Sequence, residues 1–251
     1  MNKIKKIVVY INGSEGRLGS SFSKAIVENG GNVILGDISN KKLSNNFNAK
    51  NSLFIKGDHT KIKVIDNTLK LGLKKFGKID AAINCCYPKT KKWGQPFEKL
   101  DEKHLKENIF SQLGSPIIFS QRVIKFFRKQ GFGNLIYVSS IQGISPPKFD
   151  HYKNTNMTSP IEYSAVKSGI ISITKYLAKY CGKENIRVNC ITPGGILDNQ
   201  PKIFKQKYKK SCLNKGLLDS ADLNGTILYL LSEESKYVNG QNIIIDDGWS
   251  L

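Results

Sequence analysis

Long apolar segments are missing from this sequence. No run of 18 or more apolar residues occurs among its 251 positions, and the polar start Met-Asn-Lys leads straight into a strand-like segment. A membrane-spanning helix needs about 20 consecutive apolar residues, and a signal peptide needs a shorter apolar core. We therefore expect no membrane span, no signal peptide and no membrane partner.

Paired cysteine motifs are missing too. The five cysteines are an odd number, none shows Cys-x-x-Cys spacing, and most lie within or beside apolar segments. Because disulfides belong mainly to oxidising compartments, this pattern indicates reduced thiols in a cytoplasmic protein. Cys85 and Cys86 are adjacent, but no cluster of His or Cys nearby completes a ligand set, and we expect no metal site.

Acidic residues and arginine are scarce. The sequence has 39 basic and 20 acidic residues, a formal net charge of +19, and only four arginines. Such a charge suggests nucleic acid, a membrane surface or an anionic substrate. Bidentate recognition of phosphate favours arginine, whereas these lysines occur in every segment without alternating with aromatic residues. The composition therefore disfavours nucleic acid and favours a small-molecule substrate, which could be anionic.

What the sequence does contain is an alternation of strand-like and helix-like segments. Strands are predicted at 4–11, 32–37, 52–58, 79–87, 135–138, 185–195 and 242–248, and helices at 20–30, 61–76, 98–130 (one or two), 161–181 and 219–232. Residues 40–51 read as a solvated loop or short helix. Strands that alternate with helices predict one α/β domain over 1–251, a doubly wound parallel sheet of about seven strands. In the second helix Ile62, Ile65, Leu69 and Leu73 should face that sheet.

A glycine-rich turn follows the first strand. Gly13, Gly16 and Gly19 lie between that strand and an amphipathic helix that stops at Gly30 and Gly31. Gly13 would allow a tight turn, Gly16 a close approach of the backbone to phosphate, and Gly19 close packing of helix on strand. The segment predicts a pyrophosphate-binding turn, although a glycine triplet also serves in plain turns.

Asp37 ends the second strand, 18 residues after Gly19. A carboxylate there can accept hydrogen bonds from the adenosine ribose and repels a 2′-phosphate, which favours NAD over NADP. Two alternatives stay open. Arg17 could pair with a 2′-phosphate, and Asp37 could be only a turn residue or helix cap.

Ser140, Tyr163 and Lys167 predict a proton-transfer unit that acts on a carbonyl or an alcohol. Tyr163 and Lys167 are four apart in a segment with helical periodicity, so they should share one helical face. A fixed cation favours the phenolate, but lowering the tyrosine pKa by about three units requires about 4 kcal/mol, so we expect help from a cationic cofactor ring. Ser140 follows an apolar strand and should emerge at its carboxyl end, where open α/β sheets bind ligands. A Tyr-x-x-x-Lys pair by itself is more often a surface pair.

The order of these motifs resembles the short-chain dehydrogenase/reductase family along essentially the whole chain. Asp58, Asn84, Pro193-Gly194 and the closing G-Q-N-I-I-I-D-D-G complete the match. The resemblance implies a Rossmann fold in which Tyr163 transfers the proton, Lys167 lowers its pKa and holds the nicotinamide ribose, and Ser140 binds the reacting oxygen. It implies dinucleotide contacts from Gly13, Gly16, Arg17, Leu18, Gly19, Asp37, Asp58, Asn84, Tyr163, Lys167, Pro193, Gly194 and Ile196. It also implies a homodimer or homotetramer built on the helices at 102–130 and 161–181.

Several positions depart from the family pattern. Asn84-Cys85-Cys86-Tyr87 replaces the usual Asn-Asn-Ala-Gly, which puts a bulky ring near the nicotinamide site. The tetrad asparagine is replaced by Gln112 or, one turn earlier, by Asn108. Asp198 stands where a threonine commonly follows the Pro-Gly turn. The 22 residues between Ser140 and Tyr163 are more than the family usually has, and this insertion should shape the substrate pocket.

The insertion, with residues 191–201 and 235–248, is similar to a subgroup associated with flagellin modification and surface-glycan biosynthesis. This implies a sugar or amino-sugar substrate, possibly phosphorylated or acidic. Residues 195–216 should form a mobile substrate lid. Its lysines (Lys202, Lys205, Lys207, Lys209 and Lys210) could attract an anion or form a solvated face. His151 and Tyr152 could contact substrate or lie on a polar surface.

These observations predict an NAD-dependent oxidoreductase that moves a hydride between nicotinamide and a carbonyl or secondary alcohol. Two alternatives compete with a sugar-pathway enzyme. A 3-oxoacyl reductase of lipid synthesis would prefer NADPH, and Asp37 disfavours it. A non-catalytic nucleotide-binding subunit is suggested by the altered Asn84 motif and Gln112, but the retention of Ser140, Tyr163 and Lys167 argues against it.

Overall fold

One parallel sheet organises the molecule. The structure, a computed structural model, describes residues 4–39 and 47–251. Within them, seven strands pair in the order β3-β2-β1-β4-β5-β6-β7. The strands are β1 (Val8–Asn12), β2 (Asn32–Asp37), β3 (Ser52–Lys56), β4 (Ala81–Asn84), β5 (Gly133–Val138), β6 (Ile186–Pro193) and β7 (Asn242–Ile245). The strand order reverses between β1 and β4, and open α/β sheets bind ligands beside the carboxyl ends at such a point. The predicted single-domain Rossmann fold is confirmed.

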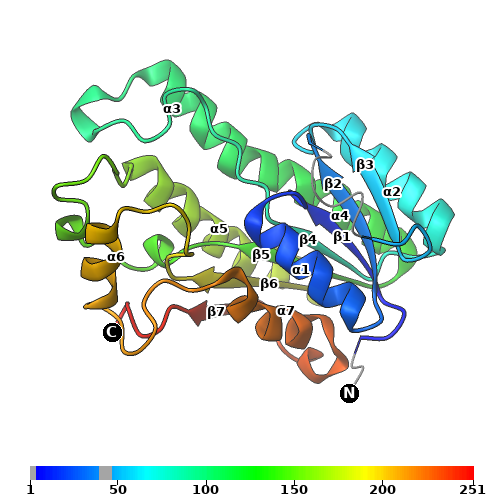
Figure 1. Cartoon of the computed structure of the whole chain (residues 1–251). Helices are drawn as coiled ribbons and strands as arrows, with labels where there is room; N and C mark the ends of the chain where they lie inside the picture. The colour runs from blue at the N-terminus through cyan, green and yellow to red at the C-terminus, as the bar shows by residue number, and fades with distance from the viewer. Residues whose placement is uncertain (1–3, 40–46) are drawn as a thin grey trace.

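Helices cover both faces of the sheet (Figure 1). The helices are α1 (Arg17–Glu28), α2 (Ile62–Phe76), α3 (Glu102–Ile109), α4 (Ser115–Gln130), α5 (Ile161–Tyr180), α6 (Lys202–Lys209) and α7 (Asn224–Leu231). Side chains of α2, α4 and α5 pack in one apolar core, and side chains of α1 and α7 pack in the other. Successive strand residues point to opposite faces, so Tyr10 enters the first core and its neighbours Val9 and Ile11 enter the second.

Two local predictions need correction. Residues 4–6 form a turn, not a strand: Lys6 has φ 62° and its N–H donates to the Gly30 carbonyl, so β1 begins only at Val8. In α2, Ile65 and Leu69 are buried, but Ile62 and Leu73 are 44% and 42% exposed. The helix turns a different stripe inward because Gly72, which has no side chain, lets it approach Ile34.

The predicted helical region 98–130 contains two helices joined without a break in direction. A five-residue π-helical turn, Phe110–Gly114, connects α3 to α4. The predicted loop or short helix at 40–51 falls largely outside the described residues. In Figure 1 the segment before α3, the insertion before α5, helix α6 and the C-terminus lie at the same end of the molecule. That end is where the candidate site is built.

Candidate active site

The glycine-rich turn between β1 and α1 has the backbone geometry that the sequence predicts. Gly13 has φ 83°, and a side chain there would collide with the backbone of Cys86, so only glycine fits. Gly19 packs directly on the Gly13 carbonyl. No side chain caps the N-terminus of α1, so its first N–H groups, those of Arg17, Leu18 and Gly19, are available to an anion.

Two carboxylates follow the neighbouring strands. Asp37, the last residue of β2, accepts hydrogen bonds from the Glu15 and Ser39 amides at 2.9 and 3.1 Å. It therefore caps its own turn, as one alternative held, and also reaches the glycine-rich turn. Asp58 accepts hydrogen bonds from the amide and hydroxyl of Thr60. Partial burial opposes ionisation of Asp58, but these bonds hold its pKa below the usual value.

Arg17 does not point toward Asp37. Its guanidinium donates to the Leu197 carbonyl at 2.9 Å and forms an ion pair with Asp198, on the loop that follows β6. That loop starts at Pro193 and Gly194, and Ile196 bridges to Leu218. Because Asp198 already engages Arg17, the structure gives no support to the alternative in which Arg17 pairs with a 2′-phosphate.

Ser140 and Tyr163 meet at the carboxyl end of the sheet. Ser140 lies two residues beyond β5, and its buried hydroxyl lies beside the Tyr163 phenol, where it acts to lower the tyrosine pKa. Tyr163 lies in the first turn of α5, and Lys167 follows one turn later. The predicted trio is therefore brought together by one strand end and one helix.

Burial acts against the charged forms of both Tyr163 and Lys167. Burial raises the pKa of Tyr163, while the neighbouring Ser140 hydroxyl opposes the rise. Lys167 donates from Nζ to the Val138 carbonyl at 3.0 Å, and burial lowers its pKa to about 8. The same Nζ lies 5.5 Å from the centroid of the Tyr163 ring, so the lowering of the tyrosine pKa by this cation stays a prediction.

A narrow cavity of about 10 Å³ lies behind the trio, large enough for about one water molecule. Asn84, Gln112 and Lys167 are among the residues that line it. Gln112, in the π-helical turn, donates to the Pro88 carbonyl at 2.8 Å, but its buried Oε1 has no partner. Asn108 instead donates to buried Glu162 at 3.3 Å. Of the two candidates for the tetrad asparagine, Gln112 is the one that faces the cavity.

Tyr87 brings its ring to the site, as expected from its replacement of glycine. The ring centroid lies 5.6 Å from that of Tyr163 and 5.6 Å from that of Trp93. Trp93, Lys89 and Gln142 had not been singled out in the sequence. Their nearness to the ends of β4 and β5 is the signal that could have identified them, because ligands bind at such ends.

The insertion before α5 is attached to α6 through His151. This histidine is buried, its Nε2 lies 2.9 Å from the Ser211 hydroxyl, and its ring packs against Tyr208 and Trp249. His151 is thus a core residue and not a substrate contact. Tyr152 is the residue of the insertion that comes near Tyr163, and Gln142 donates to its hydroxyl.

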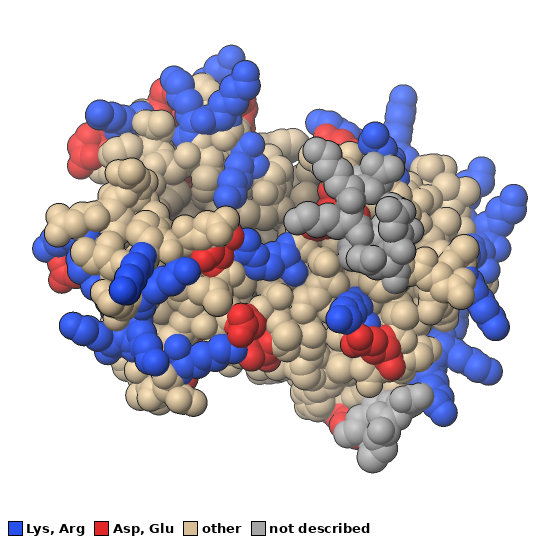
Figure 2. Space-filling model, viewed as in Figure 1, with Lys and Arg blue, Asp and Glu red and all other residues tan. Residues whose placement is uncertain are grey.

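Lys207, one of the lysines in the 195–216 segment, donates to the Asp150 and Lys153 carbonyls and so also ties α6 to the insertion. Elsewhere, lysine and arginine side chains are spread over the visible face and do not gather on one element (Figure 2). All five cysteines are free, and burial raises the Cys86 thiol pKa to about 12. Among the described residues, no helix has the length and apolar character needed to cross a bilayer, and no three His, Cys, Asp or Glu side chains gather as metal ligands.

Known proteins match this chain along its whole length. A family model described as enoyl-(acyl carrier protein) reductase matches residues 14–250. The chain is 41% identical over 252 residues to post-translational flagellin modification protein A of Campylobacter coli, covering 97% of this chain and 98% of the relative. It is 30% identical over 263 residues to 7alpha-hydroxysteroid dehydrogenase of Bacteroides fragilis, covering 100% and 97%.

A solved structure is also similar to this chain over its whole length. The short chain dehydrogenase of Leptospira borgpetersenii, crystallised with bound NAD+, has a TM-score of 0.89 and 31% identity, covering 100% of this chain and 95% of that one. The predicted family and its flagellin-modification subgroup are thereby confirmed. The chain belongs to the short-chain dehydrogenase/reductase family.

Proposed function

We propose that this protein is an NAD-dependent oxidoreductase that interconverts a secondary alcohol and a carbonyl on a sugar intermediate of surface-glycan biosynthesis. The observation that carries the chemistry is the placement of the Ser140 hydroxyl beside the Tyr163 phenol, one helical turn from Lys167, at the carboxyl end of β5. A phenol beside a serine hydroxyl, at the place where α/β sheets bind ligands, can pass a proton to or from a substrate oxygen.

The residues around the sheet fit a dinucleotide. The uncapped α1 terminus suits a pyrophosphate, and Asp37 suits a ribose diol. The preference for NAD agrees with the NAD+ in the Leptospira structure. When bound, the nicotinamide accepts or supplies the hydride.

Side chains of the protein itself carry out the proton transfer. Tyr163 protonates the carbonyl oxygen or takes the alcohol proton, and Ser140 orients that oxygen. Lys167 holds a ribose hydroxyl and, with Gln112 lining the same small cavity, passes the proton toward solvent. Residues 195–216 act as the substrate lid, with α6 docked on the insertion by Phe204 and Tyr208.

The sugar assignment is supported by the flagellin modification protein of Campylobacter coli, the relative with 41% identity. A steroid substrate is the second candidate, because the Bacteroides fragilis relative is a hydroxysteroid dehydrogenase at 30% identity. Asp37 disfavours the NADPH-linked 3-oxoacyl reductase, since its carboxylate stands where a 2′-phosphate would have to lie.

The deciding experiment is titration of the pure protein with NADH and NADPH, followed by nicotinamide fluorescence. We expect tighter binding of NADH, and Asp37→Ala should reduce that preference. A nucleotide-linked screen of sugar alcohols and ketones then tests turnover in wild type and Tyr163→Phe. Failure of both nucleotides to bind, or full activity in Tyr163→Phe, would overturn the proposal.

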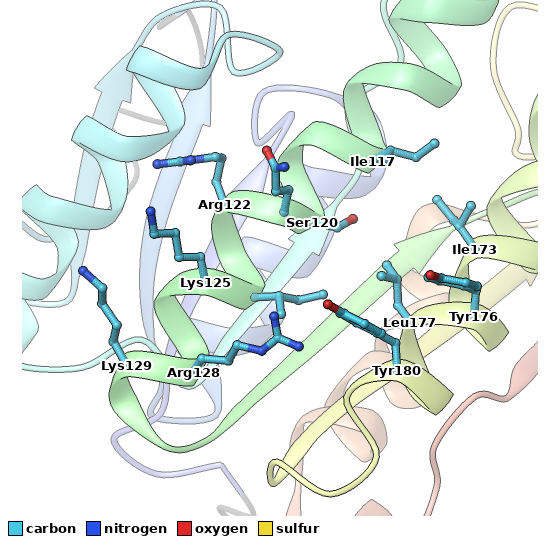
Figure 3. Close-up of a pocket in the computed structure, with 12 residues that line it drawn as sticks. Ile117, Ser120, Arg122, Lys125, Arg128, Lys129, Ile173, Tyr176, Leu177 and Tyr180 are labelled. Carbon is cyan, nitrogen blue, oxygen red and sulfur yellow. The ribbon is translucent and has the colours of Figure 1, made fainter.

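We also propose that the protein is a homo-oligomer built on α4 and α5. A groove of about 770 Å³ between these helices is lined by apolar side chains that include Ile117, Ile173 and Leu177. Tyr176 is 67% exposed and Tyr180 57%. In Figure 3, Arg128 and Tyr180 approach each other across the groove, and Arg122, Lys125 and Lys129 are further lining residues from α4. Exposed apolar surface of this kind marks an interface between copies.

Sedimentation of the wild type and of Ile173→Glu tests the oligomer. We expect the wild type to sediment as a dimer or tetramer and the variant as a smaller species, because an unpaired carboxylate at the centre of an apolar interface is costly. Lys24→Glu, a charge change on the exposed face of α1 and not in the groove, is the control. A monomeric wild type would contradict this part of the proposal.

A further inference from the structure

We propose that Tyr87 and Trp93 form the wall that receives the substrate's sugar ring, and that Lys89 binds an anionic substituent on that ring. The inference rests on the proposed function and deepens it, because it assigns the residues that select the substrate. It narrows the substrate class to sugars that carry a carboxylate or a phosphate.

Three aromatic rings enclose one corner of the site. The centroids of Tyr87 and Trp93 are 5.6 Å apart, and that of Trp93 lies 6.1 Å from Tyr163, all in edge-to-face arrangements. Tyr87 is 37% exposed even though it lies beside the proton-transferring residue. An exposed aromatic surface next to the reacting atoms is available to a substrate and would otherwise be left in contact with water.

The loop that carries the wall is held in place on three sides. Gln112 donates to the Pro88 carbonyl at its start, and Thr158 of the insertion donates to the Gly94 carbonyl at its end, 2.5 Å away. Lys92 pairs with Asp101 at 3.0 Å. The Trp93 ring packs edge-to-face on the Tyr87 ring. A rigid wall loses little conformational entropy when a ligand stacks on it.

Lys89 differs from the other lysines near the site. Its Nζ lies over the Tyr87 ring, 4.8 Å from the ring centroid, so the ammonium lies against the aromatic wall itself. The pKa of Asp198 is lowered chiefly by its hydrogen bond with Arg17 and least by the charge of Lys89. Asp198 is already paired with Arg17, and among the described residues no carboxylate lies within ion-pair distance of Lys89. This exposed ammonium is therefore available to an anionic group.

The aromatic wall and the Lys89 ammonium together favour one class of substrate. The C–H faces of a sugar ring can pack on aromatic rings, whereas the sugar hydroxyls require polar partners at the edge. Ser140 and the Tyr152 hydroxyl, which accepts a hydrogen bond from Gln142, are polar groups that sugar hydroxyls can meet near Tyr163. A steroid would also pack on the rings but has few hydroxyls to offer these two groups. Carboxylate and phosphate both satisfy Lys89, so the test must separate them.

The experiment uses Trp93 as its own reporter, because the chain has only two tryptophans and Trp249 is 3% exposed. Tryptophan fluorescence of the NAD+-saturated protein is titrated with glucose, glucuronate, glucose 6-phosphate, inorganic phosphate and cholate. We expect both anionic sugars to change the fluorescence and to bind roughly 3- to 5-fold more tightly than glucose. Whichever anionic sugar binds more tightly distinguishes a carboxylate from a phosphate.

Matched variants show which residues produce the signal. Trp93→Phe should abolish the fluorescence change, and Lys89→Met should remove the preference for anionic sugars. Lys91→Met, an exposed lysine two residues further on, should leave that preference intact. The inference is wrong if no sugar changes the fluorescence, if glucose binds as tightly as the anionic sugars, or if cholate binds most tightly. Such a failure, with normal NADH binding, would leave the proposed oxidoreductase activity standing.

Discussion

Arg17, the first residue of α1, forms an ion pair with Asp198, 181 positions further along the chain, on the loop that follows β6. The same guanidinium donates to the Leu197 carbonyl at 2.9 Å. These contacts tie α1 and the glycine-rich turn before it to the first residues of the 195–216 segment.

Breaking this pair should affect nucleotide release more than stability. Both side chains are nearly half exposed, at 43% and 46%, so Asp198→Ala should change the free energy of unfolding by less than about 1 kcal/mol. Stopped-flow displacement of NADH should show several-fold faster dissociation, because the loop is released from α1. Lys24→Ala, which breaks an exposed pair within α1, is the control. Slower dissociation would mean that Asp198 instead withholds Arg17 from the cofactor phosphates.

Alcohol oxidation should accelerate as the pH rises. It requires Tyr163 without its proton, and burial raises the pKa of this phenol, so the competent fraction grows by up to about tenfold per pH unit below that pKa. Carbonyl reduction needs the protonated phenol and should persist through neutral pH. The check is kcat/KM against pH in both directions with a substrate from the screen. An oxidation rate that falls between pH 7 and 9 would contradict this account.

The lowered pKa of Lys167, about 8, also predicts a change in stability with pH. Between about pH 8 and the unfolded value of 10.5, the unfolded chain binds a proton here that the folded chain does not, so stability rises with pH. Relative to Lys167→Met, the wild type should gain up to about 3 kcal/mol across this range. Urea unfolding of both proteins at pH 7.5 and 10.5 measures the difference. If the difference in unfolding free energy between the two proteins were the same at both pH values, Lys167 would not be desolvated.

Alanine substitutions of Gln112 and Asn108 should have different effects, one on catalysis and the other on stability. Gln112→Ala should lower kcat by roughly one to two orders of magnitude with little change in KM, because its free Oε1 faces the cavity beside Lys167. Its solvent deuterium isotope effect should increase as the relay becomes limiting. Asn108→Ala should instead destabilise the fold by about 1–3 kcal/mol, since buried Glu162 loses its partner. The opposite pattern would make Asn108 the relay residue.

The insertion should loosen in mild acid. Burial, followed by repulsion from Lys148 and Lys207, lowers the pKa of His151, whereas Asp150 opposes this. As the pH falls below 6.5, the unfolded segment gains a proton more readily than the folded one, so the insertion loses stability. Hydrogen exchange of residues 144–160, corrected for intrinsic rates, should be less protected at pH 5.5 than at 7.5. In His151→Phe the protection of these residues should depend less on pH than in the wild type. If both proteins show the same pH dependence, another group causes it.

The sequence by itself determined the features that depend on short-range patterns. The alternation of apolar strands and helices specified the seven-stranded sheet, because side-chain periods of 2 and 3.6 are local properties. The glycine at position 13 specified the turn, since its φ of 83° favours glycine. The spacing of Tyr163 and Lys167 placed them one helical turn apart.

Only the tertiary structure decided the features that depend on distant neighbours. The pKa of Tyr163 follows from how deeply the surrounding segments bury it. Gln112 lines the cavity beside Lys167 from the π-helical turn whereas Asn108 contacts Glu162, and the partner of Arg17 comes from a loop near the other end of the chain. His151 is a core residue because α6 packs on it. Burial and long-range contact set these properties, and neither is encoded in the spacing of nearby residues.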